Sequence, residues 1–276
     1  MRLLALLGLF AAPNLARQVP AHIRSLYNSI RAKGQCSNIL AGGYYSQEND
    51  ARDFGYCGDH LESDGIVYLQ GTGGNLVNMD IDCNGGPSSL GGPCEKSTDD
   101  QPLTYFREIF QSYHRTQRDD LDADVHSFVT FGNYIANVGT HGYKVYDPRS
   151  IGIEPYSIMA VICGDKLVYG VWGDADTDGG PGLVGEASAS IGKHCYGDAV
   201  SLFRPHDVND VLYIAFTGND ALPGPDGAKW NATSFHEFEK SLQAQGDRLI
   251  ARIGRGRRVT ACARREMNIG STILFK

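Results

Sequence analysis

The chain has 276 residues, 42% of them hydrophobic, and a formal net charge of −7. This length is enough to bury one large core, and no linker, low-complexity tract or internal repeat divides the sequence, so we predict a single folded domain. The acidic balance argues against nucleic acid as a partner and favours cationic ligands, although acidity for solubility alone is the competing explanation.

The amino terminus has the pattern of a secretory signal. Met1-Arg2 precedes an apolar run of about ten residues, which is too short to span a bilayer. We predict cleavage after Ala16, so that residues 1–16 are a signal peptide and the mature protein is secreted and extracellular, with no membrane as a partner. The sequon Asn231-Ala232-Thr233 agrees with export and marks Asn231 as a glycosylation site.

Three segments have the three-and-four spacing of apolar residues that is typical of an amphipathic helix. The first spans residues 20–33, and the last begins at Ser234, where Glu237 completes a capping box. The expected core positions on these helices are Ile23, Leu26, Tyr27, Ile30, Phe106, Ile109, Phe110, Tyr113, Phe235, Phe238, Leu242 and Leu249.

Between these helices the sequence changes to alternating or short apolar runs rich in β-branched residues, which favour strands. Strands outnumber helices and do not alternate regularly with them, which argues against a doubly wound α/β fold. We therefore predict a β-rich α+β protein with a barrel-like mixed β core and peripheral helices. The expected strands cover residues 66–69, 128–131, 157–162, 167–172, 184–189 and 211–216.

Seven cysteines occur, with no Cys-x-x-Cys pair and no histidine at the spacing of a zinc ligand. In an exported chain disulfides are the default. We prefer local pairing, in which each pair brackets one loop region, although six cysteines allow fifteen connectivities. The preferred pairs are Cys36 with Cys57, Cys83 with Cys94, and Cys163 with Cys195, which leaves Cys262 over.

The last residues differ from the rest of the chain in charge and in pattern. Residues 251–276 contain seven Lys and Arg against one Glu, a net of +6, so residues 1–250 hold −13 (−7 minus +6). Apolar periodicity also stops at residue 253. We predict that residues 17–253 form the domain and that residues 254–276 are a basic, disordered tail.

A stretch rich in Gly and Asp separates two apolar runs near the middle of the chain, with Asp174 after the first run and Glu186 in the second. A strand ending at Trp172 and another starting near Val184 would bring both carboxyls to the same end of adjacent strands. Cleavage of a glycosidic bond needs one carboxylic acid that protonates the leaving oxygen and one carboxylate that activates water or attacks. An ordinary Asp/Gly turn is the alternative interpretation.

A calcium loop is a second alternative for the same stretch. Asp174-x-Asp176-x-Asp178-Gly179 matches the first half of such a loop, but the twelfth position, where a bidentate acid is needed, is Gly185. The flanking segments also lack helical spacing. The competing function is therefore a non-catalytic secreted carbohydrate-binding protein with an irregular calcium-binding Asp loop.

Eight blocks follow one another along the sequence: Tyr56-Cys57-Gly58-Asp59, Asn78-Met79-Asp80-Ile81-Asp82-Cys83, Asp120-Leu121-Asp122-Ala123, Phe131-Gly132-Asn133, Ser157 to Cys163, Tyr169 to Asp174, Gly185-Glu186-Ala187-Ser188 and Asp207 to Leu212. Together they resemble the fungal chitosanases of glycoside hydrolase family 75, in that family's order, and the match runs from about Val19 to Ile250. The resemblance implies an endo-acting hydrolase of chitosan, the β-1,4 polymer of glucosamine, that works with inversion. It also implies that Asp174 and Glu186 are the essential pair, and six family cysteines match Cys36, Cys57, Cys83, Cys94, Cys163 and Cys195.

Within the pair we assign Glu186 as the general acid, because its more apolar surroundings in the sequence would raise the pKa of a carboxyl. Asp174, in a Gly-rich loop, is then the base that activates water, and the residues leave the reverse assignment open. The loop that bears Asp176, Asp178 and Pro181 is longer than the family pattern, so Asp176 competes for the role of Asp174. We expect no cofactor and no metal.

Chitosan is cationic when its amines are protonated, so an acidic groove would attract and orient it. Each acidic candidate has a turn or capping role as its alternative, and each aromatic candidate has the hydrophobic core. We expect a monomer with chitosan as its partner. The predicted substrate-binding residues are Asp80, Asp82, Tyr169 and Trp172.

Overall fold

The computed structural model describes residues 17–47, 50–85, 94, 103–113, 118–134, 143–177 and 182–255. The expected signal peptide, Asp178 and Cys262 lie outside these residues, as does nearly all of the expected tail. Within them the helices are α1 (Ala21–Lys33), α2 (Leu61–Asp64), α3 (Arg107–Ser112), α4 (Ala189–Tyr196), α5 (Gly224–Gly227) and α6 (Phe235–Ile250). The strands are β1 (Ile39–Tyr44), β2 (Phe54–Cys57), β3 (Ile66–Gln70), β4 (Val77–Asp82), β5 (Phe128–Asn133), β6 (Ile158–Cys163), β7 (Lys166–Asp176), β8 (Glu186–Ser188) and β9 (His206–Phe216).

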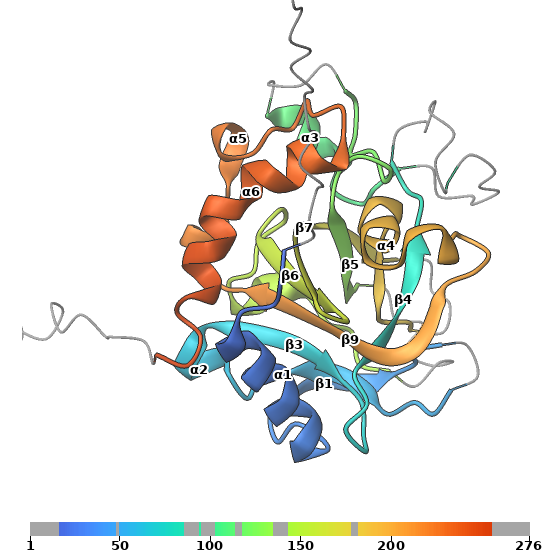
Figure 1. Ribbon diagram of the computed structural model, residues 1–276, viewed down its shortest axis with the longest axis vertical. Helices are drawn as coiled ribbons and strands as arrows, with labels where there is room; N and C mark the ends of the chain where they lie inside the picture. The colour runs from blue at the N-terminus through green and yellow to red at the C-terminus, as the bar shows by residue number, and fades with distance from the viewer. Residues whose placement is uncertain are drawn as a thin grey trace, which may run out of the picture.

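The strands form one mixed sheet in the order β1-β2-β3-β9-β4-β8-β5-β7-β6. A further pairing between β6 and β9 joins the two ends of the run from β9 to β6, so that these six strands form a closed ring. The other three strands extend the sheet outward from β9, as Figure 1 shows. The predicted β-rich α+β class with a mixed β core is therefore confirmed.

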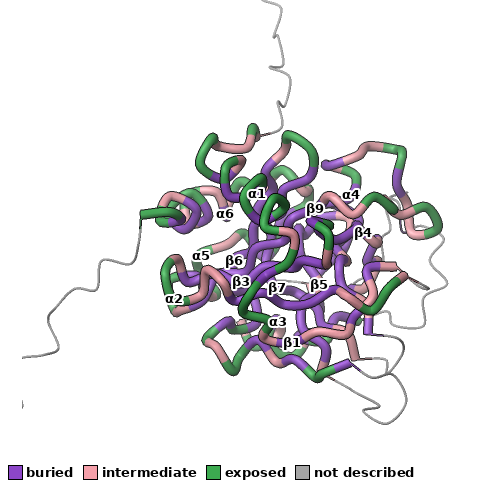
Figure 2. The backbone as a smooth tube through the Cα atoms, turned by 90° about the horizontal axis from the view of Figure 1, so that it is seen from below, coloured by how far each residue is buried: buried purple, intermediate pink, exposed green. Residues whose placement is uncertain are grey.

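The helices lie outside the sheet, and the longer ones, α1 and α6, each bury one face. On α1 that face is the predicted one, and Gln70 of β3 donates a hydrogen bond from Nε2 to the carbonyl of Ile30 at 2.8 Å. The last helix, α6, packs on β6 and β7, and its residue Ile250 is in contact with His22 of α1. Gly246 of α6 sits against the ring of Tyr169, where a Cβ atom would come within 2.6 Å of a ring carbon. Figure 2 shows the buried strands inside and the exposed outer faces of α1 and α6.

The start of α6 is capped much as predicted. Ser234 Oγ accepts the backbone N–H of Glu237 at 3.3 Å, and the Glu237 carboxylate returns to the backbone N–H of Thr233 at 2.9 Å, one residue before the expected partner. Three expected core positions differ, and one of them, Tyr113, is only partly buried. Phe235 is only half-buried, and Ile109 points outward with 38% of its surface exposed, because α3 covers only Arg107–Ser112 and buries Phe110 alone.

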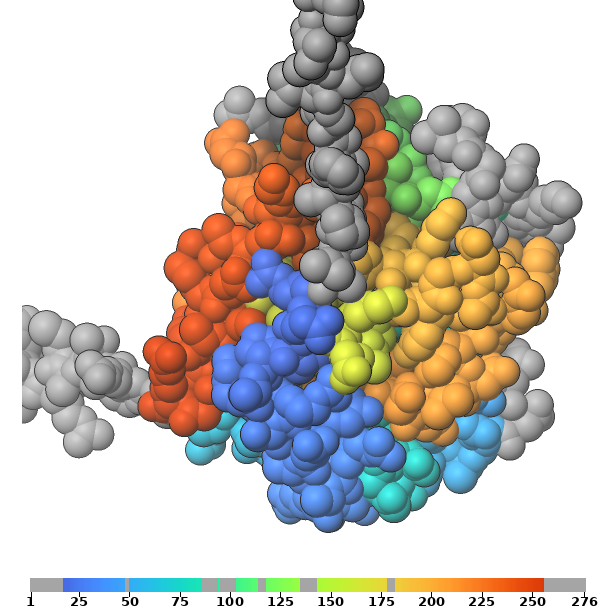
Figure 3. Space-filling view, in the orientation of Figure 1, coloured from blue at the N-terminus to red at the C-terminus, as the bar shows by residue number. Residues whose placement is uncertain are grey.

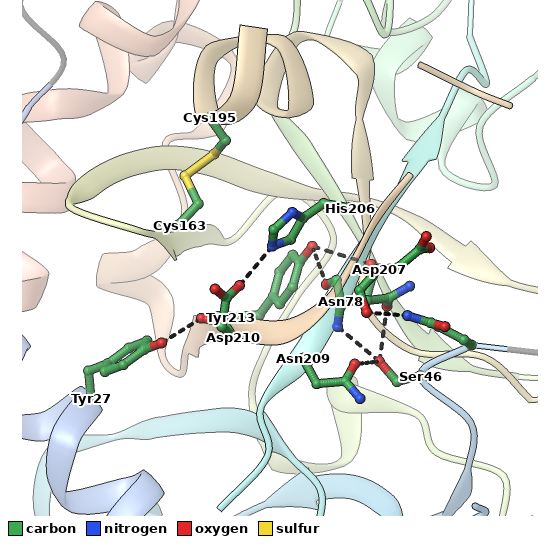
Figure 4. A network of polar contacts seen from close by, with 12 residues as sticks. Tyr27, Ser46, Asn78, Cys163, Cys195, His206, Asp207, Asn209, Asp210 and Tyr213 are labelled. Atoms are coloured by element: carbon green, nitrogen blue, oxygen red, sulfur yellow. Dashed lines mark hydrogen bonds and ion pairs between the residues drawn. A yellow bond between two sulfur atoms is a disulfide. The ribbon is translucent and has the colours of Figure 1, made fainter. Parts of the chain in front are cut away.

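Three disulfides join Cys36 to Cys57, Cys83 to Cys94, and Cys163 to Cys195. This confirms the local pairing. The last of them ties the end of β6 to α4 (Figure 4), and the turn that follows β6 lies at the surface beside α1 (Figure 3), where Arg24 donates to the carbonyl of Gly164 at 2.6 Å. No helix in the described part of the chain is both long and apolar enough to cross a membrane.

Candidate active site

Four neighbouring strands place one residue each in a row across the sheet. Asp80 on β4 is paired with Glu186 on β8, Glu186 with Thr130 on β5, and Thr130 with Asp174 on β7. Directly paired residues on neighbouring strands point to the same face, and neighbouring strands lie about 4.8 Å apart. The row therefore collects three carboxyl groups on one face of the sheet.

The expectation that Asp174 and Glu186 end adjacent strands is wrong in one respect, because β5 lies between β7 and β8. The two residues are thus two strand spacings apart, about 10 Å between Cα atoms. Thr130 fills the intervening position. Which strand lies between two others is set by pairings of distant segments, which local sequence patterns cannot reveal.

A bulge in β7 sets the direction of the Asp174 side chain. Val129 is paired with Trp172 and Thr130 with Asp174, so Gly173 is an extra residue on β7. In a regular strand with no bulge, Trp172 and Asp174 would point to the same face of the sheet, because side chains two residues apart on a strand do so. Gly173 also has no room for a side chain, because a Cβ atom would come within 2.5 Å of the Phe128 Cβ.

The Asp174 carboxyl is buried, with 2% of the residue exposed, and it is held by three hydrogen bonds. Its Oδ1 accepts the backbone N–H groups of Tyr105 and Ala175, both at 2.8 Å, and its Oδ2 accepts from Asn84 Nδ2 at 2.9 Å. Burial raises the pKa of Asp174 well above its usual value, the charge of Asp82 raises it further, and the three donors oppose the rise because they stabilise the ionised form.

Glu186 has different surroundings. It is partly exposed, and none of the described residues donates a hydrogen bond to its carboxyl. Burial of the carboxyl group raises the pKa of Glu186 well above its usual value, and the charges of Asp82, Asp80 and Asp174 raise it further. The two members of the pair therefore differ in the way that acid and base catalysis requires, since only Asp174 has donors that favour its charge.

Asp82 is buried between them, with 2% of its surface exposed. Its Oδ1 accepts the backbone N–H of Asn84 at 2.6 Å, and its Oδ2 accepts the Thr130 hydroxyl at 2.6 Å. These two hydrogen bonds fix the orientation of the Asp82 carboxylate. Its electrostatic effect reaches both members of the pair, because it raises the pKa of Asp174 and the pKa of Glu186.

Asp80 is half-buried and stands directly beside Glu186. Its Oδ1 accepts from Asn78 Nδ2 at 2.9 Å. Asn78 is itself fixed, because its backbone N–H donates to Ser46 Oγ at 2.9 Å and because Ser46 Oγ also lies 2.9 Å from Asn209 Oδ1. Figure 4 shows this buried network, which reaches from β9 through Ser46 to the strand that carries Asp80.

The turn into β8 depends on Gly185, whose φ of +107° is rare for other residues. A Cβ atom there would come within 2.6 Å of Asn78 Oδ1. The Gly185 carbonyl accepts the backbone N–H of Asp80 at 2.8 Å and the Tyr213 hydroxyl at 3.3 Å. These contacts hold Gly185, the residue before Glu186, against β4 and β9.

The two aromatic side chains expected to bind sugar are both fully buried. Tyr169 lies under α6 and donates its hydroxyl to Asp247 at 2.8 Å, and Trp172 packs against the edge of Phe106 with ring centroids 4.8 Å apart. Both therefore have the core role that the sequence left as their alternative. Asp176, the competitor of Asp174, accepts from Asn133 Nδ2 at 2.6 Å and belongs to the next pair along β5 and β7.

Four residues of the site were not expected from the sequence: Asn78, Asn84, Tyr105 and Thr130. A signal for part of the site was present, because residues 77–82 alternate apolar Val77, Met79 and Ile81 with polar side chains, the period of a half-buried strand. No local pattern marks Tyr105, whose contact with Asp174 is made by its backbone. Among the described residues, no group of three or more His, Cys, Asp or Glu side chains could hold a metal ion.

Comparison with known proteins shows the family to which the chain belongs. The family model described as fungal chitosanase of glycosyl hydrolase group 75 matches residues 79–252. An endo-chitosanase of Aspergillus oryzae (strain ATCC 42149 / RIB 40) is 38% identical over 240 residues, 86% of this chain and 92% of the relative. An endo-chitosanase of Aspergillus fumigatus is 38% identical over 238 residues, with the same coverage of both chains. The chain therefore belongs to the fungal chitosanases of glycosyl hydrolase group 75, the family that its sequence blocks resemble.

Proposed function

We propose that this protein is a secreted endo-acting hydrolase that cleaves the β-1,4 bonds of chitosan with inversion, using Glu186 as general acid and Asp174 as general base. The observation that carries the proposal is the row across β4, β8, β5 and β7, in which two carboxyls with different surroundings face the same side. The curated relatives, named endo-chitosanases, support the substrate class.

The strand register supports inversion. Inverting enzymes need about 6.5 to 9.5 Å between the two carboxyls to admit a water molecule, whereas retaining enzymes need about 5 to 5.5 Å. Asp174 and Glu186 are two strand spacings apart, about 10 Å between Cα atoms, which suits the wider gap once the side chains lean together. Asp80 and Glu186 are one spacing apart, about 4.8 Å, and would suit retention instead.

The hydrogen bonds support the division of roles. Glu186 has no donor among the described residues and several acidic neighbours, so it holds a proton that it can give to the leaving oxygen. Asp174 has three donors, so it can accept a proton from the water that attacks the anomeric carbon. After one turnover Glu186 is ionised and Asp174 is protonated, and exchange with solvent restores both.

The charge of the site supports a cationic substrate. Asp80 and Asp82 add negative charge beside the pair. Residues 1–250, the chain without its basic last residues, carry a net charge of −13 (−7 minus +6). We assign Asp80, the more accessible of the two, to a protonated amine of the substrate, and Asp82 to the electrostatics of the pair. Export is supported by the signal-like amino terminus, by the three disulfides and by the exposed position of Asn231, which we propose as a glycosylation site.

The test uses soluble chitosan and follows viscosity and reducing ends together. An endo-acting enzyme lowers viscosity steeply while few reducing ends appear. Proton NMR of the first minutes of hydrolysis should show the α-anomer. A β-anomer would refute inversion and point to the closer pair of Asp80 and Glu186, and unchanged viscosity with pure folded protein at every mildly acidic pH would refute the enzyme.

A further inference from the structure

Tyr105 is an exposed aromatic residue directly beside the candidate base. Its backbone N–H donates to Asp174 Oδ1 at 2.8 Å, yet 49% of the residue is exposed. Most other aromatic side chains near the site, including Trp172, are buried. The position of Tyr105 therefore combines contact with the reacting carboxyl and an accessible ring.

Stacked rings hold the Tyr105 side chain from behind. Its ring lies against Tyr134 with centroids 5.1 Å apart and an interplanar angle of 22°, and Tyr134 in turn stacks on Trp172 at 6.2 Å and 21°. Phe106 supports one side of Tyr105 in an edge contact at 5.2 Å. The Arg149 guanidinium lies 5.1 Å from the centroid of Tyr134. A ring supported in this way loses little conformational entropy when a ligand covers its open surface.

The backbone of this segment is also fixed. The N–H and the hydroxyl of Thr104 both donate to the buried carboxylate of Asp120, at 2.8 and 2.6 Å. Tyr105 is thus held on one side by the bonds of Thr104 to Asp120 and on the other by its own bond to Asp174. Its half-exposed ring is pre-positioned next to the carboxyl where the sugar must react.

We propose that Tyr105 is a sugar-binding platform, on whose ring a glucosamine unit of chitosan stacks next to the bond that is cleaved. The proposal rests on the proposed function and adds a subsite to it. A pyranose ring presents an apolar C–H face that suits an aromatic ring, and a protonated amine at the edge of the sugar is attracted to the electron-rich face of the ring. The acidic row would bind the charges of the chain while Tyr105 binds the sugar face.

The test measures binding separately from catalysis. Glu186→Gln removes the proposed acid, so the affinity of this variant for a β-1,4-linked glucosamine hexamer can be measured by calorimetry without hydrolysis. Adding Tyr105→Ala should weaken binding by about 3- to 30-fold, the range expected for one ring contact with a partly solvated cationic ligand. Tyr105→Phe should bind nearly as well as tyrosine, because it keeps the ring.

Matched controls exclude a general loss of structure. Ile39→Ala removes a side chain with the same 49% exposure from β1, at the far end of the sheet order, and should leave affinity unchanged. In the otherwise unchanged enzyme, Tyr105→Ala should raise KM more than it lowers kcat, because the backbone bond to Asp174 remains. All variants should melt within a few degrees of the parent.

Three results would overturn the platform. The first is an unchanged affinity of Tyr105→Ala, and the second is an equal affinity of Tyr105→Leu and Tyr105→Phe. The third is a loss in kcat of Tyr105→Ala with KM and affinity unchanged, which would assign Tyr105 only to the placement of Asp174. If the unmodified protein hydrolyses chitosan and any of these occurs, the platform fails and the proposed function stands. If it does not hydrolyse chitosan, the proposed function fails, and the affinities still decide the platform.

Discussion

Replacing Asp82 by Asn should move the whole pH profile of hydrolysis toward lower pH. Asp82 is buried and raises the pKa of both Asp174 and Glu186. The substitution removes its charge and preserves its shape. Its amide oxygen can still accept the N–H of Asn84, and its amide nitrogen can donate to Thr130 Oγ once that hydroxyl rotates.

The size of the shift follows from the strand geometry. Asp82 is two residues along β4 from the partner of Glu186, a diagonal neighbour at about 8 Å. Two charges at that distance interact by about 2 kcal/mol at an effective dielectric constant of about 20. That is about 1.5 pH units. Glu186 is partly exposed, and solvent screening there should reduce the shift to about one unit.

The direction of the shift is the same for both limbs of the profile. Glu186 acts as the protonated acid, so its pKa sets the alkaline limb, and Asp174 acts as the ionised base, so its pKa sets the acidic limb. Loss of the Asp82 charge lowers both pKa values, because a neighbouring negative charge disfavours ionisation of each group. Both limbs should therefore move to lower pH together.

The assay is kcat/KM for a glucosamine hexamer between about pH 3 and pH 8, which compares variants on a substrate that titrates identically for each. Asp247→Asn is the control, since Asp247 contacts Arg17 and Tyr169 on the side of the sheet covered by α6. The control should keep the parent profile. A profile that stays in place after Asp82→Asn, or that moves to higher pH, would refute the electrostatic role of Asp82.

Three further predictions concern the pair, the turn before it and the tail. Asp174→Asn and Glu186→Gln should each reduce kcat by on the order of 10²- to 10⁴-fold without unfolding the protein, and Asp176→Asn should cost much less; an inactive Asp176→Asn enzyme would show that the long loop was misaligned. Gly185→Ala should destabilise the fold by about 2 to 4 kcal/mol in chemical denaturation, because the residue has a positive φ and its added Cβ also approaches Asn78. The control Gly73→Ala, with φ +63° and no atom within 4 Å of the added Cβ, should cost only about 1 to 2 kcal/mol. Equal losses of stability in the two variants would contradict the steric argument. A chain that ends at Ile253 should melt within about a degree or two of the full chain. Among the described residues it loses only the hydrogen bonds that the backbone N–H groups of Gly254 and Arg255 donate to Asp64 and to the carbonyl of Arg252. It should be equally or more active at low salt, and a large drop in melting temperature would show that the tail packs on the domain.

The features that the sequence determined are those set by neighbours along the chain. The helix at Ala21–Lys33 follows from the spacing of its apolar residues, and the start of α6 follows from the cap at Ser234. The disulfides join cysteines that short or moderate loops bring together, such as Cys83 and Cys94. Asp174 and Glu186 could be chosen as the candidate pair because each lies at the edge of an apolar run and within a family block.

Only the tertiary structure decided how these pieces meet. Strand order depends on pairings between distant segments, so the insertion of β5 between β7 and β8 could not be derived from either strand. The burial of Trp172 likewise depends on what covers it, and Phe106 lies 66 positions away in the chain. The Tyr105 backbone reaches Asp174 for the same reason. Periodicity shows which face of an element is apolar, but the contacts of that face depend on long-range packing. Here such packing gives the Asp174 carboxyl its hydrogen-bond donors and leaves the Glu186 carboxyl without a donor among the described residues.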